Sequence, residues 1–149
     1  MAGLSIHGTI RGKSRYFPRA VLPGTLERVE YFKIELPAGI PLLNANQRLH
    51  WSKKAAITAF LRTAAREQAK GKPKLEKVKI RAVYYAPDNR RRDVSNLFPS
   101  VKASVDGLVD SGVLDDDSDK YVVSLEMVRG GENRPGGQLV IEVIEAVDV

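Results

Sequence analysis

The sequence predicts an α+β fold in which a mixed or antiparallel sheet of about four strands is covered on one face by two helices. Three observations favour this class. Apolar and polar residues alternate in several short stretches, as they do in half-buried strands. Two longer stretches repeat apolar residues at helical spacing. Glycine and proline mark the boundaries between them. In chain order these stretches give β-α-β-α-β-β within residues 26–149, which we expect to form a single domain.

The first strand is expected over 27–37, where apolar residues alternate before a Pro-Ala-Gly turn. A loop rich in amides follows over 38–50, and Ser52 is the predicted N-terminal cap of a helix over 53–70. Core-facing positions alternate in the strand and recur every three or four residues in the helix: Phe32, Ile34, Leu36, Ala56, Ile57, Phe60, Leu61, Ala64 and Ala65.

The strictest alternation in the chain lies over 75–86 and predicts the second strand. Residues 96–111 repeat apolar residues at helical spacing. Pro99 suits the first turn of this second helix, and Gly112 suits its end. Two further strands are expected over 120–128 and 138–147.

The composition excludes several classes of site. The 149-residue chain contains no cysteine, which excludes disulfides, zinc–thiolate sites, iron–sulfur clusters and thiol catalysis. It contains only two histidines, which excludes histidine-rich metal sites. No stretch approaches the ~18 apolar residues of a membrane span, and no signal peptide is visible. We therefore expect a cytoplasmic protein with no membrane partner and no small-molecule cofactor.

The net charge of +6 is unevenly distributed along the chain. Residues 1–25, expected to be a partly disordered arm or a short hairpin, carry four bases and no acid. Residues 48–72 contain seven bases and one acid, whereas residues 106–119 contain six aspartates and no base. A basic half suits a polyanion such as nucleic acid, and a bound cation would relieve the repulsion among the aspartates. A simply solvated charged surface is the alternative.

A run of three arginines, Arg90 to Arg92, is followed by Asp93 between the second strand and the second helix. Crowded arginines favour a nearby anion, and arginine suits bidentate contacts with phosphate. A carboxylate among arginines stays ionised and can contribute to a metal site. The alternative is a solvated turn in which Asp93 caps the start of the helix.

A dense acidic run, Asp115 to Asp119, directly precedes the third strand. Such carboxylates suit Mg²⁺, which takes one or two protein carboxylates and keeps several waters. A magnesium ion beside arginines is an arrangement for phosphodiester cleavage. Lys102 is the candidate for stabilising the developing charge. The alternative role of Lys102 is an ordinary surface ion pair with Asp106, which lies four residues further along the helix.

The loop from Leu43 to Trp51 combines amides, a base, a histidine and the only tryptophan of the chain. Such a loop can contact phosphates and stack on an unpaired base. For Trp51 itself we favour the other interpretation, that it anchors the start of the helix in the core. The candidate DNA-binding residues are Asn44, Asn46, Arg48, His50, Lys53, Lys54, Arg90, Arg91 and Arg92.

Together these features resemble the RusA-type Holliday junction resolvases, many of which come from phages and prophages. The resemblance covers about residues 30–145 and is densest over 86–122. The family pattern is a basic run, then Asp-x-Asp-Asn, a lysine, Asp-x-Leu, Gly-Val and an Asp-Asp pair. The corresponding residues here are Arg90, Arg91, Arg92, Asp93, Asn96, Lys102, Asp106, Leu108, Gly112, Val113, Asp116 and Asp117.

The resemblance implies a RusA-like nuclease domain and a homodimeric, Mg²⁺-dependent endonuclease, with Mn²⁺ as a substitute metal. It would resolve four-way DNA junctions in a bacterial cell by nicking paired strands symmetrically, since a twofold dimer suits a symmetric junction. Asp93, Asp117 and Lys102 would be catalytic. Asp93, Asp117 and the adjacent Asp116 would bind the metal. The supporting residues would be Ser95, Asn96 and Asp106.

Two departures from the family pattern leave alternatives open. Ser95 replaces the second aspartate of Asp-x-Asp and supplies no charge. Lys102 lies six residues after Asn96, where the family usually has three, and three extra residues are nearly one helical turn. The second hypothesis is therefore a non-catalytic branched nucleic-acid binding protein with a degenerate metal site. The third is a structural or interaction protein with a charged surface.

Overall fold

The computed structural model describes residues 20–21, 28–29 and 31–146. It confirms an α+β fold with a four-stranded mixed sheet and two helices. The elements of this domain are β3 (Tyr31–Glu35), α2 (Trp51–Ala69), β4 (Val78–Tyr85), the 3₁₀ helix η2 (Val94–Leu97), α3 (Phe98–Ser111), β5 (Val122–Arg129) and β6 (Gln138–Glu145).

The strand order in the sheet is β3-β6-β4-β5. Strand β6 pairs antiparallel with both β3 and β4, whereas β4 and β5 are parallel. A parallel pair needs a long crossover connection, and α3 supplies it between β4 and β5. The register places Phe32 and Ile80 on either side of Val143, so these apolar side chains share one face of the sheet.

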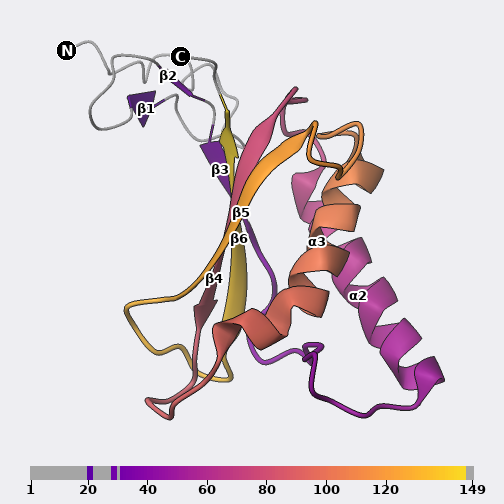
Figure 1. Ribbon diagram of the computed structural model, residues 1–149, viewed down its shortest axis with the longest axis vertical. Helices are drawn as coiled ribbons and strands as arrows, with labels where there is room; N and C mark the ends of the chain where they lie inside the picture. Colours follow the sequence, from indigo (N-terminus) through magenta and orange to yellow (C-terminus); the bar gives the residue numbers. More distant parts are fainter. Residues whose placement is uncertain (1–19, 22–27, 30, 147–149) are drawn as a thin grey trace.

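Both helices cover the same face of the sheet, as Figure 1 shows. The core lies between the sheet and the two helices. It is formed by residues that are at most 1% exposed, among them Phe32, Ile34, Leu36, Leu61, Val78, Ile80, Val101, Leu108, Leu114, Leu139 and Ile141. The alternation predicted for β3 and β4 is therefore confirmed. The second helix also follows the prediction, with Pro99 in its first turn and Gly112 at its C-cap with φ +91°, a left-handed conformation that favours glycine.

The start of α2 differs from the prediction in two respects. The helix begins at Trp51, and its cap is His50, whose side chain accepts a hydrogen bond from the backbone N–H of Ser52. Ser52 is therefore inside the helix and is not its cap. In addition, Ala56 and Phe60 are exposed, although they were expected in the core. The reason is that the first two turns of α2, residues 51–56, are exposed throughout, and full burial of this helix begins only at Leu61.

The predicted N-terminal arm, residues 1–25, lies mostly outside the described residues. The described part of the arm is β1 (Ala20–Val21), which pairs antiparallel with β2 (Arg28–Val29), a strand that follows the arm. Among the described residues, none of the helices combines the length and the apolar character needed to cross a bilayer.

Candidate functional site

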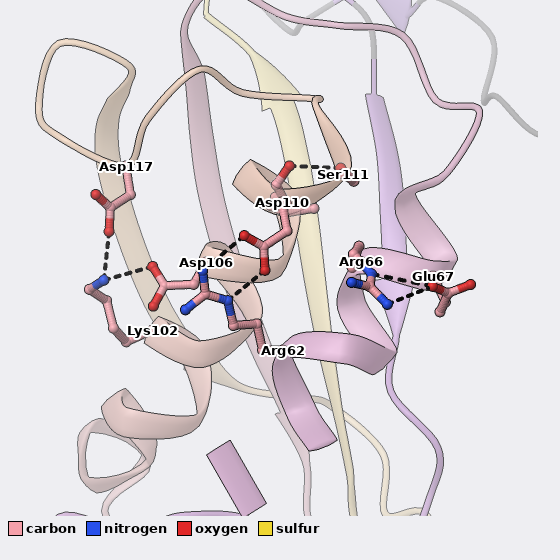
Figure 2. Close-up of polar contacts among 9 residues, drawn as sticks. Arg62, Arg66, Glu67, Lys102, Asp106, Asp110, Ser111 and Asp117 are labelled. Carbon is pink, nitrogen blue, oxygen red and sulfur yellow. Dashed lines mark hydrogen bonds and ion pairs between the residues drawn. The ribbon is translucent and has the colours of Figure 1, made fainter. Parts of the chain in front are cut away.

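Lys102 lies between two aspartates that come from different parts of the chain. Its Nζ donates to Asp106 Oδ1 at 2.8 Å and to Asp117 Oδ2 at 2.6 Å. Figure 2 shows Lys102 and Asp106 on α3 and Asp117 on the loop that precedes β5. The surface pair expected between Lys102 and Asp106 is therefore present, but it is only part of a three-residue cluster, the Lys102 cluster.

The topology of the fold explains this meeting. Lys102 and Asp106 are four residues apart and so lie on the same side of α3. The left-handed Gly112 then ends the helix, and the chain turns back toward the sheet to begin β5. This turn brings the acidic run alongside the helix, where Asp117 contacts Lys102. All three side chains remain accessible, since Lys102, Asp106 and Asp117 are 48%, 26% and 29% exposed.

The ionisation of the Lys102 cluster follows from these contacts. Hydrogen bonds to Asp106 and Asp117 raise the pKa of Lys102 above its ordinary value. The hydrogen bond from Lys102 in turn lowers the pKa of Asp117. At neutral pH the lysine is therefore a cation flanked by carboxylates. In this state it can stabilise negative charge or donate a proton, but it cannot act as a general base.

Asp93 directly precedes η2, the short helix that leads into α3. Its Oδ1 accepts hydrogen bonds from the Ser95 backbone N–H at 3.2 Å and from the Ser95 hydroxyl at 2.6 Å. Asp93 therefore caps η2, which is the alternative role that the sequence left open. Ser95, which replaces the family's second aspartate, acts as a donor to the first one.

The arginine run is organised by Asp88, a residue that the sequence analysis did not select. The Asp88 carboxylate accepts hydrogen bonds from the side chains of Arg90 and Arg92, which hold its pKa far below the ordinary value. Arg129 at the end of β5 donates to the backbone carbonyls of Asp88 and Arg90. Arg91 and Arg90 are exposed, whereas Arg92 is half-buried. The turn thus presents two arginines to solvent from a fixed backbone.

The amide-rich loop packs against η2 and the start of α3. The backbone N–H of Ala45 donates to the Asn96 carbonyl at 2.7 Å. The buried hydroxyl of Ser100 accepts from the Leu43 N–H at 2.6 Å and donates to the Leu43 carbonyl at 2.9 Å. These contacts explain why the loop lies beside the arginine turn, although about fifty residues separate them in the chain.

A cavity of about 270 Å³ lies between this loop and η2. It is lined by Asn44, Tyr84, Arg92, Asp93, Val94, Asn96 and Leu97. Amides, a carboxylate, a guanidinium and an aromatic ring thus surround one space. Two of the predicted DNA contacts, Asn44 and Arg92, share this cavity with the predicted catalytic Asp93.

The other predicted DNA contacts lie nearby on the surface. Arg48, His50, Asn46, Lys53 and Lys54 are all exposed. Lys54 also lines a smaller pocket beside the cavity, together with loop residues and Pro99 of α3. The start of α2, the amide loop and the start of α3 therefore share one end of the molecule (Figure 1).

Trp51 contradicts the interpretation favoured from the sequence. It was expected to anchor the helix start in the core, but it is 75% exposed. The physical reason is the early start of α2, which projects its first turns past the buried part of the helix. The sequence itself contains a signal for this exposure, because Trp51 is followed directly by Ser-Lys-Lys and not by apolar residues.

The arrangement of the carboxylates shows how far they fit the ligand requirements of a divalent cation. Asp106 and Asp117 already surround one cation, the Lys102 ammonium, and Mg²⁺ needs only one or two protein carboxylates. Asp116 is exposed next to them. Within the described part of the chain, however, no three acidic or histidine side chains gather closely enough to hold a metal ion. Asp106 and Asp117 thus share the Lys102 ammonium, and among the described residues Asp93, Asp116 and Asp117 do not form one three-carboxylate group.

No protein-family model and no curated protein matches this chain. The fold and the site define an α+β domain with a basic, amide-rich end and a lysine–aspartate cluster on its crossover helix.

Proposed function

We propose that this chain is a Mg²⁺-dependent, structure-specific DNA endonuclease that resolves four-way junctions as a homodimer by paired symmetric nicks. The Lys102 cluster is the observation that carries the proposal. Its three members follow the order of the RusA-type pattern, and residues 15 positions apart meet around one ammonium group. A protonated lysine held by two aspartates suits a site where phosphate and metal meet.

The basic end supports the choice of nucleic acid as the substrate. Exposed Arg90 and Arg91 suit phosphate contacts, and the neighbouring amides suit contacts with sugar or base. The cavity links this surface to Asp93. A strand lying along the basic end would therefore pass the first carboxylate of the pattern.

Asp117 and Asp106 are the residues that would hold Mg²⁺, and Asp116 is adjacent to Asp117 in the chain. Asp93 caps η2 and is not grouped with these carboxylates. When bound, Mg²⁺ would supply a water of lowered pKa and would neutralise charge on the phosphate. Lys102, kept protonated by the two aspartates, would stabilise the charge on the phosphate oxygens. Asp93 and Asn96 would orient the strand at the start of α3.

The test uses a labelled mobile four-way junction and a linear duplex of the same sequence. We expect paired nicks confined to the junction in Mg²⁺ and binding without cleavage in EDTA. Asp117→Asn should abolish cleavage and preserve junction binding. Asp115→Asn is the matched control, because Asp115 pairs with Lys74 at 2.7 Å and not with Lys102. Cleavage by Asp117→Asn at the wild-type rate would refute the assignment of this cluster.

Two observations favour the second candidate, a non-catalytic protein that binds branched nucleic acid. Asp93 Oδ1 is occupied by two hydrogen bonds from Ser95, and the described residues contain no three-carboxylate group. This candidate predicts tight junction binding that ignores Mg²⁺ and no cleavage in Mg²⁺ or Mn²⁺. Ser95→Asp, which restores the family's second aspartate, would then create activity. A wild-type protein that cleaves would refute this candidate.

A further inference from the structure

Trp51 is far more exposed to solvent than is expected for a large apolar side chain. It is the only tryptophan of the chain and is 75% exposed, the highest value among the large apolar residues that the structure describes. Exposing an indole to water forgoes the stabilisation that burial of a large apolar side chain supplies. A single such residue at the start of a helix contributes little to the core and is free to contact a partner.

The backbone of Trp51 is positioned by the capped start of α2. His50 caps α2 through its bond from the Ser52 N–H, and its Nδ1 also lies 2.8 Å from the Ser52 hydroxyl. The His50 and Trp51 rings lie 5.5 Å apart between centroids and are tilted by 33°. Because Trp51 is the first residue of a regular helix, its backbone is ordered before any partner binds. This preorganisation lowers the entropy cost of a contact.

The charge around Trp51 indicates what kind of partner it meets. Residues 36–66 contain five bases and no acid. Lys53 and Lys54 follow Trp51 after one serine and are exposed. On the other side lies the amide loop, which reaches the cavity beside Asp93. An aromatic face among cations and amides matches a nucleic-acid strand, whose phosphates are anionic and whose unpaired bases stack on aromatic rings.

We propose that Trp51 is a stacking platform for an unpaired base at the branch point of DNA. This inference rests on the DNA-binding part of the proposed function and holds whether or not the protein cleaves. Lys53 and Lys54 would contact the phosphates that flank this base, and Trp51 would contribute little to binding of continuous duplex. Trp51 would thereby help the protein to distinguish a junction from linear DNA, because an intact duplex has no unstacked base to offer.

The experiment measures binding of the full-length protein in EDTA to a four-way junction, a single-stranded oligonucleotide and a linear duplex. Trp51→Ala should weaken junction and single-strand binding by about tenfold or more and change duplex binding much less. Trp51→Phe should retain most of the affinity. Phe60→Ala is the control, since Phe60 is a 48% exposed aromatic about 13 Å further along the same helix. The Phe60→Ala protein should bind all three DNA molecules with unchanged affinity.

Because Trp51 is the only tryptophan, its own emission reports the contact. Junction DNA should quench this emission, and duplex should quench it much less. Equal junction binding by wild type and Trp51→Ala, or unchanged emission in a saturated complex, would overturn the inference while leaving the proposed nuclease intact. Quenching without cleavage in Mg²⁺ would support the inference and refute the nuclease. A shift of Trp51→Ala from dimer to monomer, with DNA affinity unchanged, would identify a protein contact instead and overturn the inference.

Discussion

Gly107 of α3 packs directly against α2, and replacing it with alanine tests the packing that positions Lys102. A Cβ added at this residue would lie 2.4 Å from the Arg62 carbonyl oxygen, 2.8 Å from Ala65 Cβ and 3.0 Å from the Arg66 nitrogen. Two of these three atoms belong to the backbone of α2 and cannot rotate away. The two helices would therefore have to separate.

Two effects of opposite sign determine the size of the change. Alanine is favoured over glycine inside a helix by about 0.8–1.0 kcal/mol. Overpacking a core typically costs about 1–3 kcal/mol, and a contact of 2.4 Å with a carbonyl oxygen belongs at the upper end. We therefore expect Gly107→Ala to lower the free energy of unfolding by about 2 kcal/mol. For a chain of this length, the melting temperature should fall by about 4–8 °C.

The assay is thermal and urea unfolding followed by far-UV circular dichroism, because an exposed Trp51 reports poorly on burial. The control is Gly131→Ala, since a Cβ at Gly131 meets nothing within 4 Å and its φ is not left-handed. Its stability should change by less than about 0.5 kcal/mol. A Gly107→Ala protein that is more stable than wild type would show that helix propensity dominates and would refute the close approach of α2 and α3.

Three further predictions concern charge. Burial, and then Glu142, raise the pKa of Tyr31 from 10 to about 12. The stability contributed by its neutral phenol is complete below pH 10 and is lost as pH rises toward 12. A phenolate absorbance titration should show one late step that Tyr31→Phe removes, and a titration without that step would contradict this. Arg62 holds Asp110 through bonds of 2.5 and 2.8 Å, with side chains 47% and 30% exposed. A double-mutant cycle to alanine should give a coupling of about 0.5–1 kcal/mol, and a value near zero would show that solvent screens the pair. Finally, removing residues 1–19, which carry four bases, should reduce the salt slope of DNA binding by about three to four if all four contact phosphates. An unchanged salt slope would show that the arm does not contact the DNA.

Much of the fold follows from local patterns in the sequence. Alternation at Val78, Ile80 and Ala82 was enough to predict β4 and its buried face. Helix α3 was predicted from apolar spacing with Pro99 at its start and Gly112 at its end. These signals are local, because side-chain direction in a strand or helix depends only on a short repeat. The order of the candidate residues along the chain was likewise readable without a structure.

The tertiary structure decided what local patterns do not contain. The parallel pairing of β4 with β5 and the turn after α3 bring Asp117 to Lys102, and Ser100 brings the amide loop to η2. Such meetings depend on how distant segments pack, which no short repeat encodes. The exposure of Trp51 is of the same kind. A tryptophan beside an apolar helix suggests burial, but burial requires that another element cover it, and α2 begins before the covered part of the helix is reached.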